Sequence, residues 1–186
     1  AQNIPLIEAI MPQSNIETIS SASKYSGFFN MMPDKAGVVR WMPAVFKCNE
    51  ALYAPLSLIA ASAYLDAPMA VKIAGHGVEE VQIGRLSIPT DELGRVLINY
   101  RGKEKTFPHI SITDILNGEI SDNILKDKIV MVGATAVGIF DLRVTPFGNV
   151  FPGLEIHANV IDAILSKDFM YQPGWAAIFD IMAIMA

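Results

Sequence analysis

The clearest hydrophobic pattern in the chain is a short apolar run at residues 129–132. The run follows Lys128, consists of isoleucine, valine, methionine and valine, and stops at Gly133. A continuous run of this length that is rich in β-branched side chains is typical of a strand with both faces buried. We therefore predict a buried strand at residues 129–132.

The segment that follows, residues 134–153, combines glycines and prolines with polar side chains and has no sustained period. This composition predicts an irregular surface loop that is too long for a plain connection. Long ordered loops commonly carry function. Asp141 and Arg143 are closely spaced opposite charges in it, and we expect a rigid loop in which Asp141 binds backbone amides or an arginine.

From Leu154 the pattern becomes helical. One polar stripe, at positions i, i+4, i+7 and i+11, consists of Glu155, Asn159, Asp162 and Ser166. The other side is apolar and carries Val160, Ile161, Ile164 and Leu165. His157 lies among the apolar positions, which favours a core histidine over a ligand contact.

Strand patterns dominate the first hundred residues. Strands are predicted at residues 27–30, 38–46, 51–54, 81–83, 85–88 and 95–100. Turns are predicted at residues 34–37, 47–50 and 91–94, and Gly37 is expected to adopt a positive φ. Residues 1–23, which contain two prolines and several polar residues, should form a loosely structured arm with one helical turn.

Two further helices complete the expected elements. Pro55 suits the first turn of a helix that runs to about Leu65. The buried side of this helix should carry Leu56, Ile59, Ala60 and Ala63. A short helix at residues 114–117 is predicted, with Ser111 or Thr113 as its N-cap and Gly118 at its end. These elements predict an α/β fold, with a mixed β-sheet and flanking helices in a single domain.

Composition limits the possible functions. The chain has 186 residues, a net charge of −5 and an isoelectric point of about 5.1. This balance provides no basic patch for nucleic acid or anionic lipid. The single cysteine, Cys48, rules out an intrachain disulfide and a cysteine-rich zinc site.

Signatures of catalysis and cofactor binding are absent from the sequence. Neither glycine-rich nucleotide-binding motif occurs, and no nucleophile elbow is present. The three histidines, His76, His109 and His157, are scattered and lack partners at helical spacing. We therefore predict no catalytic residue, no metal and no cofactor in this chain.

Six residues remain as candidates for ligand binding, and each has a structural alternative. They are Arg101, Asp141, Arg143, Glu155, His157 and Asn159. The first three are charges that suit a charged ligand. For Asp141 and Arg143, however, pairing with each other and with backbone to hold the loop is favoured, and Arg101 at a strand end is as often a solvated charge. Glu155 lies in the first turn of its helix, where a carboxylate stabilises the free amides in any case. Asn159 shares its stripe and is expected to bond the preceding loop.

Four stretches carry a family resemblance. KIVMVGATAVGIFDLRVTP (residues 128–146) followed by PGLEIHANVIDAIL (152–165) resembles the closing signature of the type 2 CHASE domain. GFFNMMPDKAGVVRWMP (27–43) and VLINYRG (96–102) are similar to earlier parts of that family's pattern. The sequence departs from the pattern at Ala36, where the family often has a second acidic residue. This departure weakens a metal-binding carboxylate pair at Asp34.

The resemblance implies an extracytoplasmic sensory domain of a bacterial receptor. Such domains precede adenylate or guanylate cyclases, histidine kinases and serine/threonine kinases, and we expect a cyclase. Residues 1–172 would be the sensory domain without its N-terminal portion, on the periplasmic side of the inner membrane. The apolar residues 173–186 would begin a transmembrane helix, or alternatively form an amphipathic helix packed on the domain.

The partner is then an unidentified small-molecule or protein signal, and a homodimer is compatible with this function. The chain itself is expected to have no enzymatic activity. Two readings of other classes stay open. One is a periplasmic enzyme with an acid–base pair around Asp141, His157 and Glu155. The other is a purely structural or dimerising module.

Overall fold

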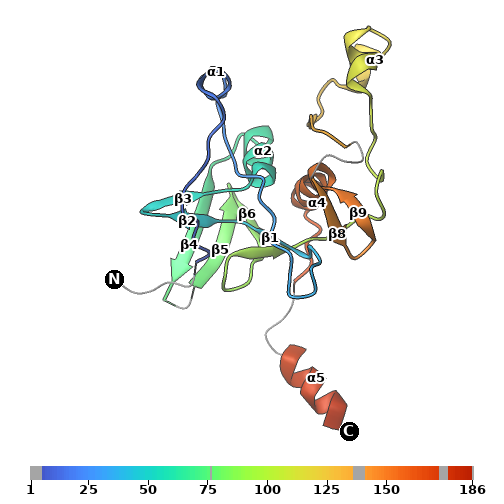
Figure 1. The fold of residues 1–186 in the computed structure, drawn as a ribbon. Coiled ribbons are helices and arrows are strands. Elements are labelled where there is room, and N and C mark those ends of the chain that lie inside the picture. The colour runs from blue at the N-terminus through green and yellow to red at the C-terminus, as the bar shows by residue number, and fades with distance from the viewer. Residues whose placement is uncertain (1–5, 76, 136–140, 172–175, 186) are drawn as a thin grey trace.

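The structure is a computed structural model that describes residues 6–75, 77–135, 141–171 and 176–185. It contains several small antiparallel sheets and a set of helices, which confirms the predicted mixed α/β fold (Figure 1). The helices are α1 (Glu17–Ser20), α2 (Leu56–Tyr64), α3 (Ile112–Leu116), α4 (Gly153–Ser166) and α5 (Ala176–Met185), with a 3₁₀ turn at Asp122–Ile124. The helical turn predicted in the N-terminal arm is α1.

The strands pair in four small antiparallel groups. β1 (Trp41–Pro43) pairs with β7 (Arg95–Leu97), and β2 (Phe46–Cys48) pairs with β3 (Ala51–Tyr53). A three-stranded sheet has the order β4 (Met69–Ala74), β5 (Gly77–Ile83), β6 (Leu86–Ile88), and β8 (Leu142–Thr145) pairs with β9 (Gly148–Pro152). The predicted turn at residues 47–50 is a two-residue hairpin loop that contains Asn49 at a φ of 54°.

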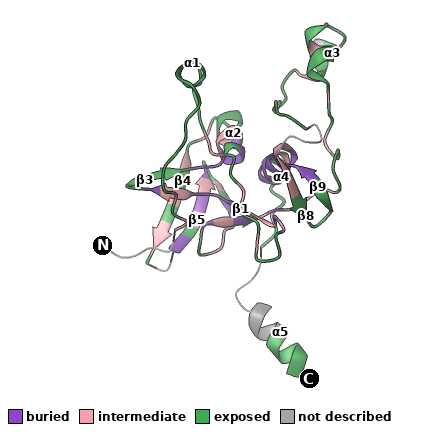
Figure 2. Ribbon diagram, viewed as in Figure 1, coloured by how far each residue is buried: buried purple, intermediate pink, exposed green. Residues whose placement is uncertain are grey.

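The core lies where α2 and α4 pack against each other and against the strands (Figure 2). Its largest fully buried side chains include Phe151, Met42, Leu58, Ile83, Ile88, Ile156 and Ile164. Because α4 supplies apolar residues at the predicted helical spacing, it packs as the sequence indicated. Leu165 is the exception on that face, since it is 37% exposed.

The predicted buried face of α2 is wrong. The buried residues are Ser57, Leu58 and Ala61, while Leu56 and Ala63 are exposed and Ile59 and Ala60 are half-buried. The cause is that α2 is apolar on nearly all sides, so periodicity alone does not fix which side contacts α4.

The strand predicted at residues 38–46 is interrupted. β1 and β2 belong to different sheets, and between them the N–H of Ala44 donates to the carbonyl of Gly94 at 2.8 Å. Pro43 ends β1 because proline has no N–H to continue a ladder. The predicted strand at residues 27–30 is reduced to an isolated bridge between Phe28 and Pro55. The strand at 95–100 ends at Leu97.

The buried strand predicted at residues 129–132 is also wrong. This segment has no regular secondary structure, and Val130 and Val132 are 49% and 77% exposed. A strand requires a hydrogen-bonded neighbour. Among the described residues, none pairs with this segment.

The segment 134–153, predicted to be an irregular loop, contains the hairpin β8–β9 instead. The hydroxyl of Thr145 closes its turn, since it accepts from the N–H of Phe147 and donates to the carbonyl of Gly148, both at 3.3 Å. The glycines and prolines of this segment therefore mark a tight turn. Residues 136–140 lie outside the described part of the chain.

Candidate functional site

Helix α4 positions three of the six candidate residues. The helix begins at Gly153 after the N-cap Pro152 and ends at Ser166, before the C-cap Lys167, whose φ of 58° is left-handed. Its polar stripe faces residues 101–107, which follow β7. Of the remaining candidates, Arg101 approaches α4 from the segment after β7, and Asp141 and Arg143 approach it from the β8–β9 hairpin.

Glu155 is 3% exposed and holds a backbone segment in place. Its carboxylate accepts from the N–H groups of Lys105 and Thr106, both at 2.9 Å, and from that of Phe107 at 3.4 Å. A buried carboxylate is tolerated when several donors replace its water. The sequence suggested a general stabilising effect at the helix N-terminus, and the structure instead gives Glu155 specific backbone partners.

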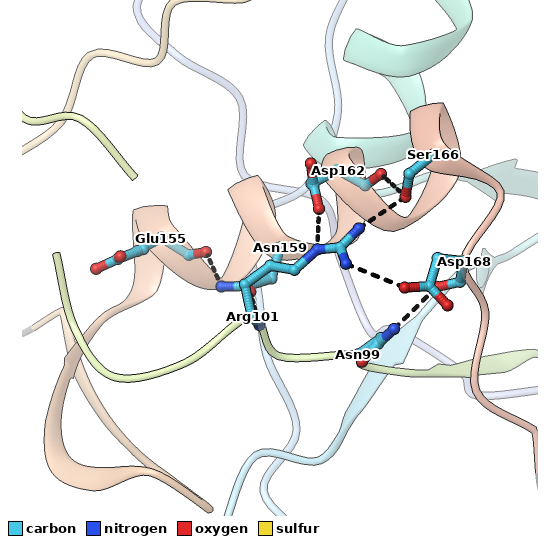
Figure 3. A network of polar contacts seen from close by, with 7 residues as sticks. All are labelled: Asn99, Arg101, Glu155, Asn159, Asp162, Ser166 and Asp168. Carbon is cyan, nitrogen blue, oxygen red and sulfur yellow. Dashed lines mark hydrogen bonds and ion pairs between the residues drawn. The ribbon is translucent and has the colours of Figure 1, made fainter. Parts of the chain in front are cut away.

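Asn159 continues the contact one turn further along α4. Its side-chain oxygen accepts from the backbone N–H of Arg101 at 2.8 Å, and its Nδ2 donates to the carbonyl of Glu155 at 2.8 Å (Figure 3). Asn159 is 1% exposed. Backbone groups therefore use both halves of the amide. Among the described residues, the partner of the Asn159 oxygen is Arg101, and not the loop before the helix, which the sequence had suggested.

Arg101 completes the network with its guanidinium (Figure 3). Nε donates to the carboxylate of Asp162, Nη1 donates to Oδ2 of Asp168 at 3.0 Å, and Nη2 donates to Oγ of Ser166 at 2.8 Å. The hydrogen bond with Asp162, and then the charges of Asp162 and Asp168, raise the pKa of Arg101. The sequence suggested that Arg101 binds the carboxylate of a ligand. In the structure, the carboxylates of Asp162 and Asp168 take that place.

A second group lies where the β8–β9 hairpin meets the start of α4. Nη2 of Arg143 lies 3.5 Å from Oδ1 of Asp141, and the carbonyl of Asp141 accepts from the N–H of Gly153 at 2.9 Å. A methyl group added to Gly153 would meet the Asp141 carboxylate at 2.5 Å. The expected arginine contact of Asp141 is therefore present, and Gly153 leaves room for it.

His157 lies one turn after Gly153, on the same side of α4. It is 2% exposed, and its Nε2 is 3.4 Å from the carbonyl oxygen of Phe29. Nδ1 is buried and has no hydrogen-bond partner among the described residues. Burial lowers the pKa of His157, while the Phe29 carbonyl and the charge of Asp141 act in the opposite direction.

The six candidates therefore form two groups. Arg101, Glu155 and Asn159 belong to the stripe network, whereas Asp141, Arg143 and His157 gather at the start of α4. Glu155 and His157 are two positions apart on the helix and so do not share a face. The acid–base trio considered for an enzyme is consequently not assembled.

Comparison with protein families decides the identity. The CHASE2 domain family matches residues 3–186. The chain belongs to the CHASE2 domain family. CHASE2 domains are extracytoplasmic sensory domains, and this confirms the resemblance seen in the sequence. No curated protein and no solved structure matches the chain.

Within this CHASE2 domain, Asp34 shapes a turn. Its Oδ1 accepts from the N–H groups of Ala36 at 2.8 Å and Val38 at 3.1 Å, and its Oδ2 pairs with Arg40. The backbone hydrogen bond from Val38 is the main cause that lowers the pKa of Asp34. Because residue 36 contributes its backbone N–H, alanine at this position preserves the turn.

Asp91 shapes a turn in the same way just before β7, the strand that pairs with β1. Its Oδ1 accepts from the N–H groups of Leu93 at 3.1 Å and Arg95 at 2.8 Å, and its Oδ2 accepts from Nε of Arg95 at 2.7 Å. The Arg95 guanidinium also lies over the ring of Trp41, 5.1 Å from its centroid. β1 and β7 are thus each preceded by a turn that an aspartate and an arginine hold. The sequence indicated the turns but not the ion pairs.

Sequence reasoning missed two members of the stripe network. Asp168 and Asn99 were not candidates, although Asp168 binds Arg101 and its carbonyl accepts from Nδ2 of Asn99 at 3.1 Å. Asp162 and Ser166 were recognised on the stripe, and their helical spacing was the signal. Asp168 lies beyond the end of the helix, so no periodicity identifies it.

A polar cleft of about 280 Å³ lies away from both groups, beside β2. It is lined by Glu8, Ala9, Ile10, Lys47 and Asn49. Across the described ranges, no three side chains of the metal-binding types come together. No helix in the described part of the CHASE2 domain has both the length and the apolar character needed to cross a bilayer.

Proposed function

We propose that this CHASE2 domain is the signal-sensing input domain of a membrane-bound bacterial receptor whose output is an adenylate or guanylate cyclase. Ligand or partner binding on the periplasmic side of the inner membrane changes the domain, and transmembrane helices carry the change to the cyclase. Membership of an extracytoplasmic sensory family supports the first half of this proposal. A histidine kinase or a serine/threonine kinase is the alternative output.

Helix α4 connects the two groups of candidate residues, and this position is the main support for the proposal. Asp141 and His157 lie toward its start, and Arg101 is bound toward its end. Beyond α4, Met170 forms a bridge with Leu97 of β7, and the chain then continues to α5. A displacement that starts at the β8–β9 hairpin would therefore act on β7 and on the connection to α5 through one rigid helix.

The membrane connection is proposed at residues 173–186, as the start of a transmembrane helix after a sensory domain at residues 1–172. The apolar side chains of Ile181, Met182, Ile184 and Met185 are exposed on α5, which favours contact with lipid or with another apolar surface. The signal is a small molecule or a protein, and a homodimer would double the helices that cross the membrane.

Labelling in intact cells tests this topology. Glu104 is exposed, so Glu104→Cys in the intact receptor provides a reactive thiol, whereas the native Cys48 is buried at 3% exposure and gives a low background. A thiol reagent that does not cross the inner membrane is expected to label the variant in intact cells. Labelling that occurs only after the membrane is permeabilised would overturn the periplasmic location.

The output is tested with a matched pair of variants in the intact receptor. Arg101→Gln removes the ion pairs to Asp162 and Asp168, whereas Lys103→Gln removes an exposed charge on the same segment. We expect altered cyclic-nucleotide production for Arg101→Gln and a normal level for Lys103→Gln. The chain alone is expected not to turn over ATP, and turnover would contradict the assignment as an input domain.

The alternatives of other classes make different predictions. A periplasmic enzyme would need an acid–base pair, and Glu155 is instead bound to backbone N–H groups on a face of α4 that His157 does not share. A purely structural or dimerising module would leave the cyclase output unchanged in Arg101→Gln while altering stability or oligomeric state. The variant pair above therefore separates a structural role from a sensory one.

A further inference from the structure

His157 is a titratable group enclosed at a contact between three parts of the domain. It belongs to α4, its Nε2 faces the carbonyl of Phe29, and the hairpin residue Asp141 acts on it through its charge. The side chain is 2% exposed, and the buried Nδ1 has no partner among the described residues. This site therefore suits a neutral imidazole, because a second ring proton, at Nδ1, has no hydrogen-bond acceptor in place among the described residues.

Within the described part of the chain, few groups affect the charge of His157. The hairpin contributes Asp141 and Arg143, both half-exposed. Nη2 of Arg143 lies 3.5 Å from Oδ1 of Asp141. The helix α2, which packs against α4, carries no charged side chain. Glu155 of α4 itself is committed to the 105–107 backbone on another face. Of the described carboxylates, Asp141 is therefore the one that a protonated His157 would use.

The geometry of α4 places that carboxylate within reach. Asp141 lies directly against Gly153, and residues i and i+4 of a helix are about 5–6 Å apart on one face. Arg143 holds Asp141 at 3.5 Å, beyond the usual range of a charge-assisted hydrogen bond. A positive imidazole one turn away can thus compete with Arg143 for this carboxylate.

We propose that His157 makes the domain responsive to external acid: its protonation draws Asp141 from Arg143 and so shifts the β8–β9 hairpin against the start of α4. This inference rests on the proposed sensory function, because it names acidification as a signal that the domain transmits through α4. An extracytoplasmic domain is directly exposed to the outside pH, so protons reach this site without a transporter.

The direction of the pH effect follows from burial. The folded-state pKa of His157 lies below the ordinary value of 6.5, so the unfolded chain binds the proton more readily. The stabilising contribution of the neutral side chain is present above pH 6.5 and is lost as the pH falls through the folded-state pKa. Acid therefore loosens the domain.

The first test follows the histidine ring protons of the full 186-residue chain by NMR between about pH 7.5 and pH 5. His157→Gln identifies the resonance of His157 by its absence. We expect a midpoint below 6.5 that moves to more acidic pH in Asp141→Asn, because the favourable charge of Asp141 is lost. A midpoint at or above 6.5, or one that Asp141→Asn leaves unchanged, would overturn the inference.

The second test measures the output of the intact receptor against external pH, beside the same series in His157→Gln and His109→Gln. His109 is exposed, so its variant is a control that also removes one histidine. We expect a pH-dependent output in the native protein and in His109→Gln, and a flat profile in His157→Gln. A flat profile in the native protein, with Arg101→Gln still altering output, would refute the acid response and leave the input-domain proposal intact. If Arg101→Gln also has no effect, the proposed function itself fails.

Discussion

The carboxylate of Asp141 lies against the Cα of Gly153, so that a methyl group at residue 153 would meet its two oxygens at 2.5 and 2.7 Å. The same two residues share a backbone hydrogen bond of 2.9 Å between the Gly153 N–H and the Asp141 carbonyl. Glycine at the first position of α4 is therefore explained by the hairpin that packs on it. Any side chain there must move Asp141 or the helix.

Gly153→Ala is expected to destabilise the domain by about 1–3 kcal/mol, because the cost of overpacking exceeds the gain of about 1 kcal/mol in helix propensity. Thermal unfolding of the purified chain measures the loss. Gly148→Ala is the matched control, since a methyl group at Gly148 would meet nothing within 4 Å. Equal melting temperatures for the two variants would contradict the close contact.

Glu155→Ala should cost about 1–3 kcal/mol, since it removes the buried acceptor of the backbone N–H groups of residues 105–107. Glu155→Gln retains one oxygen and should fall between the native protein and Glu155→Ala. Chemical unfolding gives both free energies. Glu104→Ala, a change to an exposed residue of the same segment, should leave the free energy of unfolding within about 0.5 kcal/mol of the native value.

Asn159→Asp preserves the acceptor for the Arg101 N–H but replaces the donor that binds the Glu155 carbonyl. At neutral pH the new carboxylate would be buried beside that carbonyl oxygen, which should cost about 3–5 kcal/mol. Protonation would restore a donor, so the deficit should shrink as the pH is lowered. A deficit that is constant between neutral and acidic pH would argue against the buried amide contacts.

Tyr100 provides a prediction at alkaline pH. Its hydroxyl donates to the carbonyl of Val39 at 2.8 Å, and burial raises its pKa well above the ordinary value of 10.0. The neutral phenol contributes stability below pH 10.0, and this contribution declines as the pH rises toward the folded-state pKa. Tyr100→Phe should therefore flatten the alkaline part of the curve of stability against pH. Tyr64→Phe, at a tyrosine that is 53% exposed, is the control.

The sequence predicted well those elements whose stability is local. The side chain of Ser111 caps α3 by accepting from the N–H of Thr113, and Gly118 follows the helix at a φ of 73°. Gly37 closes its turn at a φ of 77°, and α4 follows its apolar period almost from end to end. Such features depend on residues only a few positions apart, so their signals are complete in the sequence.

What sequence reasoning missed depends on tertiary partners. β4 was not predicted because Met69–Ala74 alternates weakly, and its pairing with β5 decides its conformation. Residues 129–132 have strand propensity but no paired neighbour in the described chain. In the candidate site, the chemistry of Arg101 was recognised. Asp168, which lies 67 positions away, was beyond the reach of any pattern.

The exposed segment at residues 129–132 leads to a prediction about solubility. Val130 and Val132 present β-branched side chains to solvent on a segment that pairs with no strand in the described ranges, a combination that favours edge-to-edge association. Val132→Lys should therefore reduce aggregation of the purified chain at high concentration, as measured by light scattering. Lys126→Arg, which leaves the charge near this segment unchanged, should not reduce aggregation. Equal light scattering by the two variants would contradict this origin of aggregation.

The two aspartate turns also bear on the order of folding. Asp34 and Arg40 are six positions apart, and Asp91 and Arg95 are four apart, whereas the strands that follow these turns, β1 and β7, meet from distant parts of the chain. Short loops close much faster than long ones, and non-local pairing generally limits the folding rate. We therefore expect each strand to reach its partner with its leading turn already shaped, and the slow step to be the encounter that sets Trp41 opposite Leu97. Removing either aspartate should slow refolding more than it speeds unfolding.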